Sequence, residues 1–224
     1  MSEHRKREAA LAALAELPPD GIIGIGTGST ARLFIDALGE LIASGRRRYV
    51  CVPTSQASRL QAERLGIPLL PDDGPWEIAV TVDGADEVSD ALDLIKGGGG
   101  AHTREKIVAH SSRRNVIIVD ASKLSPRLGE RWPVPVEVLS FAHLATRAHL
   151  ATLGTPTLRT AAGGAFHSDA GNLIYDVACG SIADPRALDA ALRAIPGVVE
   201  TGLFVGRADV VLVASESGVE RRAR

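Results

Sequence analysis

The first half of the chain alternates short apolar runs with segments whose apolar residues recur at helical spacing. The apolar runs predict buried strands at residues 21–25, 49–52, 67–70, 78–82 and 115–119. The periodic segments predict helices at residues 9–17, 29–43, 55–65 and 103–110. Strands that are apolar along their whole length are buried on both faces, so this order predicts a parallel sheet covered by helices. The expected fold class is α/β, doubly wound.

The pattern changes at Pro133. Strands are expected at residues 134–139, 155–161, 173–177 and 198–205, with helices at 141–153 and 185–195. The order β-α-β-β-α-β is typical of a ferredoxin-like α+β unit. A last apolar run at 210–214 is expected to return to the main sheet. We therefore expect one domain from residues 1–130 plus 206–224, with residues 131–205 inserted as a lobe.

Composition and charge narrow the range of functions. The 224 residues carry a net charge of −2, which gives no electrostatic reason to expect nucleic acid or an anionic membrane as a partner. Cys51 and Cys179 cannot form a disulfide framework, and Cys51 lies in an apolar run where a buried thiol is expected. The N-terminus lacks the apolar core of a signal peptide, and no apolar run approaches the roughly 18 residues of a membrane span. We expect a soluble cytoplasmic protein.

The segment GIGTGST, residues 24–30, joins a predicted strand to a predicted helix. Glycines allow a ligand to approach the backbone, and a helix N-terminus offers N–H donors and partial positive charge. Thr27, Gly28, Ser29 and Thr30 are therefore candidate phosphate-binding residues. NAD is disfavoured because no acidic residue follows the second strand, and ATP because the Gly-Lys-Ser/Thr sequence is absent. A tight turn with a Ser/Thr cap is the simpler alternative.

The segment VDGADE, residues 82–87, follows the predicted strand 78–82. Ligands of open α/β sheets bind at the carboxyl ends of strands, and carboxylates accept hydroxyl hydrogen bonds and move protons. Asp83 and Asp86, with Gly84 and Ala85 between them, are therefore candidate sugar-binding residues. The alternative is a turn followed by a helix cap.

A third segment places Lys96 before Gly97, Gly98, Gly99 and Gly100, and Glu105 shortly after them. Ordering four successive glycines is entropically costly, which suggests that bare backbone contacts a ligand there. Lys96 and Glu105 could then act as cation and base. A mobile loop with a helix-stabilising glutamate is the alternative.

Two further features concern cations and metals. Lys123 follows the strand 115–119 and is a weaker candidate contact. The six histidines show no metal-binding spacing and no nucleophile elbow is present, so we expect neither metal nor covalent hydrolysis.

Taken together, several segments resemble the type A ribose-5-phosphate isomerases, in order from about residue 6 to 214. They are GIGTGST, VPTSQAS, VDGADEV, LIKGGGGAHTREKIV, VDASKL, PVPVEV, GNLIYDV and IPGVVETGLF. The resemblance implies a Rossmann-like parallel sheet domain with an inserted ferredoxin-like α+β lobe. It also implies an aldose-ketose isomerase of the non-oxidative pentose phosphate pathway, converting D-ribose 5-phosphate and D-ribulose 5-phosphate through a cis-enediol(ate). No cofactor is implied, and a homodimer or homotetramer is expected.

The resemblance also assigns roles to residues. Glu105 corresponds to the proton-transferring base, and Lys6 to an N-terminal lysine that holds phosphate, although Arg5 and Arg7 flank it. Asp83, Asp86 and Lys96 are expected to join Glu105 in catalysis. The expected substrate-binding residues are Lys6, Thr27, Gly28, Ser29, Thr30, Asp83, Gly84, Ala85, Asp86, Lys96, Gly97, Gly98, Gly99 and Lys123. His102, beside the catalytic helix, receives no role.

Three other functions stay open on the sequence alone. A sugar-phosphate sensor would bind without turnover, but such sensors usually carry a DNA-binding segment, and the first strand begins too early for one. A related acyl or CoA transferase would use a glutamate as nucleophile. A sugar-phosphate deaminase of similar architecture would release ammonia.

Overall fold

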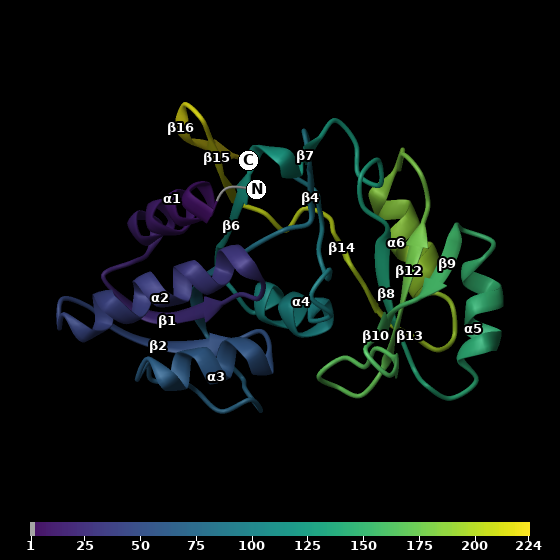
Figure 1. Cartoon of the computed structure of the whole chain (residues 1–224), viewed down its shortest axis with the longest axis horizontal. Coiled ribbons are helices and arrows are strands. Elements are labelled where there is room, and N and C mark those ends of the chain that lie inside the picture. Colours follow the sequence, from purple (N-terminus) through teal and green to yellow (C-terminus); the bar gives the residue numbers. More distant parts are fainter. Residues whose placement is uncertain (1–2) are drawn as a thin grey trace. The chain divides into compact units, whose positions relative to one another are not determined.

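The computed structural model describes residues 3–224, which form two compact units. The first unit comprises residues 3–85, 104–123 and 207–224. The second comprises residues 86–103 and 124–206. Figure 1 labels most of the helices and strands of both units.

The first unit is built on a six-stranded sheet in the order β16-β15-β6-β3-β1-β2. All neighbouring strands are parallel except β16, which pairs antiparallel with β15. The strands are β1 (Asp20–Ile25), β2 (Arg48–Pro53), β3 (Ile78–Asp83), β6 (Asn115–Asp120), β15 (Val210–Ser215) and β16 (Gly218–Ala223). The predicted parallel α/β sheet is confirmed.

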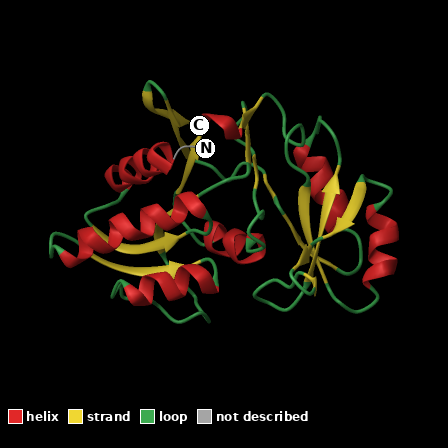
Figure 2. Ribbon diagram, in the orientation of Figure 1, coloured by secondary structure: helices red, strands yellow, loops and turns green. Residues whose placement is uncertain are grey.

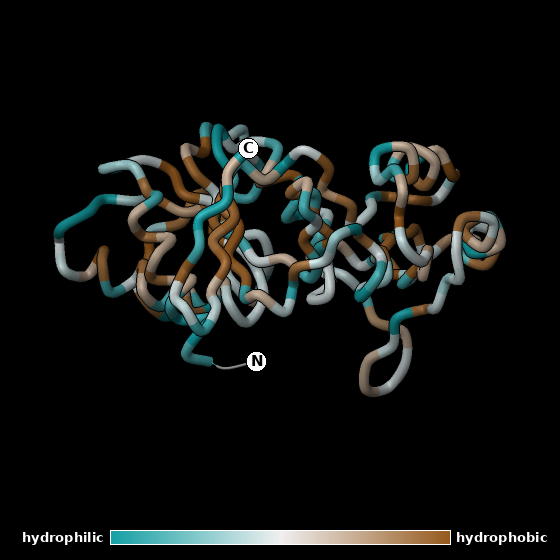
Figure 3. Tube along the Cα trace, turned by 90° about the horizontal axis from the view of Figure 1, so that it is seen from above, coloured by the Kyte–Doolittle hydropathy of each residue, from teal (hydrophilic) through white to brown (hydrophobic). Residues whose placement is uncertain are grey.

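Helices cover both faces of this sheet (Figure 2). One core cluster joins α1 (Glu3–Ala13) and α2 (Ser29–Ala43) to alternate residues of the central strands. A separate cluster packs Val108 of α4 (His102–His110) against Val52 and Ile78 on the other face. In Figure 3, brown hydrophobic segments run along the strands inside this unit. Burial of the strands on both faces explains why they read as continuous apolar runs.

The strand order reverses beside β1, because the chain passes from β1 to β2 on one side and returns to β3 on the other. Open α/β sheets bind ligands at such a switch point, outside the carboxyl ends of the strands. Ile25 of β1 pairs with Val82 of β3, so Gly26 follows one strand end while Asp83 ends the other. The fold therefore brings the GIGTGST and VDGADE segments together.

The structure differs from the sequence prediction for this unit at two segments. Residues 67–70 were expected to form a strand, but only a single bridge from Leu69 to Cys51 is present, and Pro68 cannot donate to a ladder. The C-terminal strand β16, which pairs along its whole length with β15, was not expected from the sequence. Its sequence, GVERRA, lacks an apolar signal because β16 is an edge strand with exposed charges.

The second unit contains a four-stranded antiparallel sheet in the order β13-β8-β12-β9, and the β-α-β-β-α-β order predicted for the ferredoxin-like lobe is confirmed. Asp184 caps the second helix by accepting a hydrogen bond from Ala187 N at 3.0 Å. The elements are β8 (Val134–Val138), α5 (His143–Leu150), β9 (Thr155–Leu158), β12 (Leu173–Ala178), α6 (Pro185–Arg193) and β13 (Val198–Thr201).

The same unit contains strands too short for a sequence pattern to reveal. One small sheet has the order β14-β5-β4-β7, and β10 and β11 form a separate hairpin. These strands are β4 (Glu87–Ser89), β5 (Leu94–Ile95), β7 (Leu124–Ser125), β10 (Thr160–Ala161), β11 (Gly164–Ala165) and β14 (Leu203–Phe204). Consequently the expected strand 198–205 is divided between β13 and β14, which belong to different sheets.

The compact units differ from the expected domains in two segments. Residues 86–103 and 124–130 group with the second unit rather than the first, and so does Gly206, which shifts the last boundary by one residue. An inserted lobe of residues 131–205 that folds as a domain stays a prediction. Within the described chain, the helices all fall short of the length and apolar character that a membrane crossing requires.

Candidate active site

The loop after β1 is held by the carboxylate at the end of β3. Asp83, only 3% exposed, accepts hydrogen bonds at Oδ1 from Thr27 N at 2.9 Å and from Gly84 N at 2.7 Å. Gly26 N donates to Val82 O at 2.9 Å. A Cβ on Gly26 would lie 2.0 Å from Asp83 Oδ1, so only glycine allows this approach. Asp83 thus fixes the backbone of the loop.

The loop ends at the N-terminus of α2. Gly28 is the N-cap, with φ +106°, and it has no side chain that could bond the first-turn N–H groups. Ser29 is exposed and Thr30 half-buried at the first turn. Backbone donors and the positive end of the helix dipole therefore meet there, as an anion-binding site requires.

A cluster of hydroxyl groups from the segment after β2 anchors the same loop. Thr27 Oγ1 lies 2.7 Å from Thr54 Oγ1 and donates to Ser55 Oγ at 2.8 Å. Ser58 Oγ in α3 (Gln56–Arg64) donates to Gly26 O at 2.6 Å. The Thr27 side chain is therefore engaged within the protein, while its backbone shapes the loop. The sequence reading did not assign roles to Thr54, Ser55 or Ser58, although VPTSQAS places hydroxyls after the strand next to β1.

Glu105 lies in the first turn of α4 and is 4% exposed. Its neighbour Arg104 donates to Asp72 at 3.1 Å, and Arg59 of α3 binds the same carboxylate. Burial alone would raise the pKa of Asp72, but the hydrogen bonds from the two arginines outweigh it and hold the pKa below its usual value. This ion-pair cluster fixes α4 beside α3, and the buried Glu105 carboxylate is carried by the fixed helix.

Lys123 ends the short 3-10 helix η2 (Ala121–Lys123), which follows β6 directly. Asp120, buried at the end of β6, accepts a hydrogen bond from Ser122 N at 2.9 Å and so shapes this turn. Because β6 lies next to β3, Lys123 emerges at the same sheet edge as Asp83. Lys123 itself is half-buried.

In the second unit, Asp86 binds the glycine segment. Asp86 Oδ2 accepts a hydrogen bond from Gly98 N at 2.7 Å. Lys96 is 3% exposed, its backbone N donates to Gly202 O at 2.9 Å, and its ammonium lies 5.4 Å from the centre of the Phe204 ring. The segment after Lys96 is therefore ordered, which argues against the mobile-loop alternative.

The start of α4 is also fixed by buried groups. Thr103 Oγ1 donates to Glu137 Oε2 at 2.5 Å, and the His102 ring lies 3.3 Å from Glu200 O through Nε2. The helix α4 begins at His102, one residue before the predicted start at residue 103. A Cβ on Gly97, which has φ +108°, would lie 2.7 Å from His102 Nδ1, so His102 fills the space beside Gly97.

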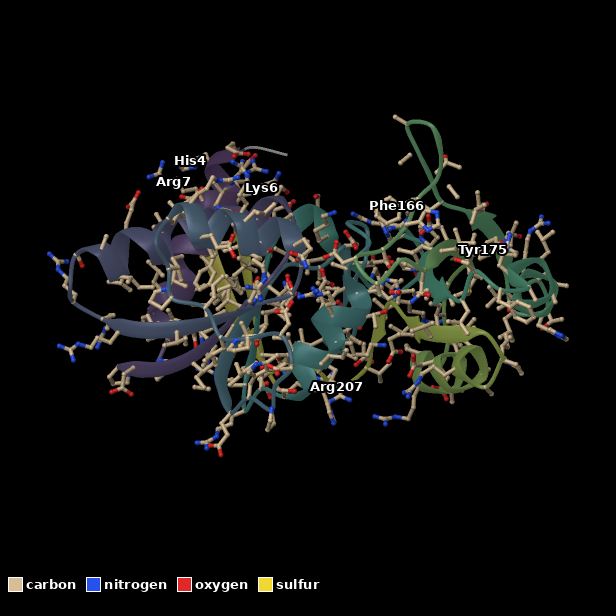
Figure 4. The ribbon with its side chains drawn as sticks, turned by 90° about the horizontal axis from the view of Figure 1, so that it is seen from below. His4, Lys6, Arg7, Phe166, Tyr175 and Arg207 are labelled. Carbon is tan, nitrogen blue, oxygen red and sulfur yellow. The ribbon has the colours of Figure 1, made fainter. Side chains whose placement is uncertain are left out.

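The N-terminal candidate, Lys6, lies on α1 (Figure 4). Arg5 is paired with Glu216 at 2.6 Å, and Arg7 lines a surface groove with Asp36 and Glu40. The two flanking arginines thus have acidic neighbours of their own. A phosphate contact by Lys6 stays a prediction.

Across residues 3–224, no three histidine, cysteine, aspartate or glutamate side chains gather as metal ligands would.

Burial raises the pKa of the Cys51 thiol to about 12, which makes it an inert core group, as the sequence suggested.

A glycine-rich loop and carboxylates at the strand ends of a parallel sheet are typical of α/β enzymes that bind small molecules. Comparison with known proteins agrees. The family model "ribose 5-phosphate isomerase A (phosphoriboisomerase A)" matches residues 50–218. The chain is 46% identical to ribose-5-phosphate isomerase A of Bradyrhizobium diazoefficiens, covering 97% of this chain and 95% of that one. It is 48% identical to that of Thermomicrobium roseum, covering 98% and 94%.

Solved structures give the same answer. Ribose 5-phosphate isomerase A from Methanocaldococcus jannaschii superposes with a TM-score of 0.95 at 38% identity, covering all of both chains. A D-ribose-5-phosphate isomerase in complex with phospho-erythronic acid superposes with a TM-score of 0.96 at 39% identity, again covering both chains fully. The chain belongs to the ribose 5-phosphate isomerase A family.

Proposed function

We propose that this chain interconverts D-ribose 5-phosphate and D-ribulose 5-phosphate, with Glu105 as the base. Family membership over nearly the whole chain supports the reaction. The observation that carries the assignment of the base is the burial of the Glu105 carboxylate in the first turn of α4, where a positioned carboxylate is suited to proton transfer.

Phosphate binding is assigned to the N-terminus of α2. The backbone N–H groups of Gly28, Ser29 and Thr30 receive the phosphate oxygens in this proposal, and Thr27, bound to Asp83, shapes the loop that presents them. The support is the helix N-terminus, capped by a glycine and held open by Asp83. Lys6 and Lys123 add positive charge toward the same phosphate.

Proton transfer is assigned to two carboxylates. Asp83 handles the hydroxyl proton as the furanose ring opens to the free aldehyde. Glu105 removes the proton from C2, the C1 carbonyl oxygen gains the electrons, and a cis-enediol(ate) forms. Glu105 returns the proton to C1, and the C2 hydroxyl proton passes to the oxygen on C1, which leaves the C1 hydroxyl and the C2 ketone of ribulose 5-phosphate.

Stabilisation of the negative charge on the enediolate is assigned to Lys96 and the glycine segment. Lys96 is a buried cation, and buried cations stabilise developing negative charge more strongly than exposed ones do. Gly97 and Gly99 supply backbone donors, Gly98 contributes by binding Asp86 through its N–H, and Gly84, Ala85 and Asp86 position the sugar hydroxyls. The relative that binds phospho-erythronic acid supports this reading, because that sugar acid has a planar carboxylate resembling an enediolate.

The proposal extends to the setting of the reaction. We place the enzyme in the cytoplasm, in the non-oxidative part of pentose phosphate metabolism, as a homodimer or homotetramer. Neither metal nor cofactor takes part in any proposed step.

Purified protein incubated with ribose 5-phosphate in EDTA provides the test. Ketopentose formation that survives chelation supports a metal-free isomerase. Binding of ribose 5-phosphate without turnover would instead indicate a sensor. Ammonia release from an amino-sugar phosphate would indicate a deaminase, and a trapped glutamyl adduct would indicate a transferase.

A further inference from the structure

One peptide unit in the second unit of the fold is bound at both of its polar ends. The carbonyl oxygen of Gly97 accepts a hydrogen bond from Arg159 Nη1 at 2.7 Å. The N–H of Gly98, in the same peptide unit, donates to Asp86 Oδ2 at 2.7 Å. A trans peptide is planar, with its C=O and N–H pointing in opposite directions. Arg159 and Asp86 therefore hold this plane from its two sides.

The next peptide unit is oriented by the same arginine. Arg159 Nη1 also lies 3.3 Å from the carbonyl oxygen of Gly98. By the same planarity, the N–H of Gly99 points away from Arg159. Gly98 and Gly99 are exposed, whereas Gly97 is buried. The guanidinium, together with the turn hydrogen bond from Gly100 N to Gly97 O at 2.9 Å, thus sets the direction of two successive backbone N–H groups in an accessible segment.

Arg159 is itself rigidly placed. Its Nε and Nη2 bind the two carboxylate oxygens of Asp176 on β12 at 3.0 and 2.5 Å. The guanidinium carbon lies 5.8 Å from the centre of the ring of Phe166, which follows the β10–β11 hairpin and is labelled in Figure 4. The Arg159 side chain is 14% exposed. A bidentate carboxylate and an aromatic ring leave the remaining donors with one direction, toward the glycine carbonyls.

We propose that Arg159 is a positioning residue for the isomerase reaction, acting through the Gly97–Gly99 backbone on Asp86 and on the N–H group of Gly99, which faces the substrate. This inference rests on the proposed function, which assigns Asp86 and the glycine segment to the sugar. A cation on the Gly97 carbonyl also polarises that peptide and strengthens the Gly98 hydrogen bond to Asp86. Lysine cannot replace it fully, because a single ammonium cannot bind Asp176 at two oxygens and also reach the glycine carbonyls.

The test is a double-mutant cycle on the full chain with ribose 5-phosphate as substrate. The variants are Arg159→Met, Arg159→Lys, Asp86→Asn and the Arg159→Met/Asp86→Asn double variant. Arg193→Met is the matched control, because Arg193 also pairs with carboxylates of the same unit, at 3.8 and 3.9 Å. For each protein kcat, KM and the melting temperature are measured.

We expect Arg159→Met to lower kcat/KM by about 10- to 100-fold, Arg159→Lys to lie between it and the wild type, and Arg193→Met to match the wild type. The kcat/KM of the double variant is expected to lie within about threefold of that of the less active single variant, because both changes disable the same hydrogen-bond network. If Arg159→Met does not fold, Asp176→Asn is used in the cycle in its place, since it leaves Arg159 present but releases it.

Two results would overturn the inference. The first is a double variant whose loss of kcat/KM equals the product of the losses in the two single variants. The second is an Arg159→Met protein with a lower melting temperature but wild-type kcat and KM. Failure of the proposed function is distinguishable from both, because the wild-type protein would then not convert ribose 5-phosphate at all.

Discussion

The backbone N–H of Thr27 donates to the Asp83 carboxylate at 2.9 Å, and this bond joins the loop after β1 to the end of β3. The two residues are 56 positions apart in the sequence and belong to separate motifs. Their contact gives Asp83 two tasks in our account, because it shapes the phosphate loop and also acts on the sugar.

Asp83→Asn is expected to impair both tasks. The variant keeps one oxygen acceptor but loses the charge that strengthens the bonds from Thr27 N and Gly84 N. We expect a higher KM for ribose 5-phosphate and a fall in kcat of about tenfold or more. Steady-state kinetics beside Asp73→Asn, an exposed aspartate, provide the comparison. A change in kcat alone would mean that Asp83 does not support the phosphate loop.

Lys123→Ala is expected to act mainly on binding. The side chain leaves the carboxyl end of β6, beside the strand that ends in Asp83, and our account gives it a phosphate contact. KM should rise several-fold while kcat changes little, and the effect should weaken in high salt because a charge contact is screened. Arg127→Ala, an exposed cation nearby in the sequence, is the control. An unchanged KM would make Lys123 a surface residue.

Much of the fold could be predicted because buried strands leave continuous apolar runs. The sheet strands β1, β2, β3, β6 and β15 were all expected near their observed bounds. Residues 67–70 misled the prediction because an apolar run records burial, not hydrogen bonding. The edge strand β16 was missed for the opposite reason, since its residues are largely exposed and charged.

The site could be predicted as a set of motifs but not as a set of contacts. Glycines and carboxylates at strand ends reveal ligand-binding chemistry, whereas the approach of Gly26 to Asp83 follows from the pairing of β1 with β3. Arg159 belongs to no motif, because it binds backbone carbonyls, and these occur at every residue. Only the folded backbone shows which carbonyl a side chain reaches.

The stability of the first unit is expected to depend on Glu16 at acidic pH. Glu16 binds Arg221 of β16 at 2.8 Å and also Arg114, which precedes β6. The hydrogen bond from Arg221 lowers the pKa of Glu16, burial opposes this, and Arg114 lowers the pKa further, so that it lies below its usual value of 4.5. The folded state therefore gains stability from ionised Glu16 above about pH 4.5 and loses it as the pH falls through the lowered pKa.

Glu16→Gln should thus lower the melting temperature by about 2–4 °C at pH 7, equivalent to ~1 kcal/mol for a chain of this size. The difference from the wild type should shrink as the pH is lowered below the usual value of 4.5. Thermal melts between neutral and acidic pH measure this, with Glu77→Gln at an exposed ion pair as the control. A difference that does not depend on pH would show that the lost stability is not electrostatic.

The most direct test of the central claim is the reaction of Glu105→Gln with ribose 5-phosphate in D2O. The variant keeps the shape of the buried side chain but cannot accept the C2 proton. We expect kcat to fall by about 10²- to 10⁴-fold, with deuterium incorporation into the sugar falling in parallel and ribose 5-phosphate binding largely retained by calorimetry. A variant that keeps half of the wild-type turnover and still exchanges deuterium would contradict the assignment of Glu105 as the base.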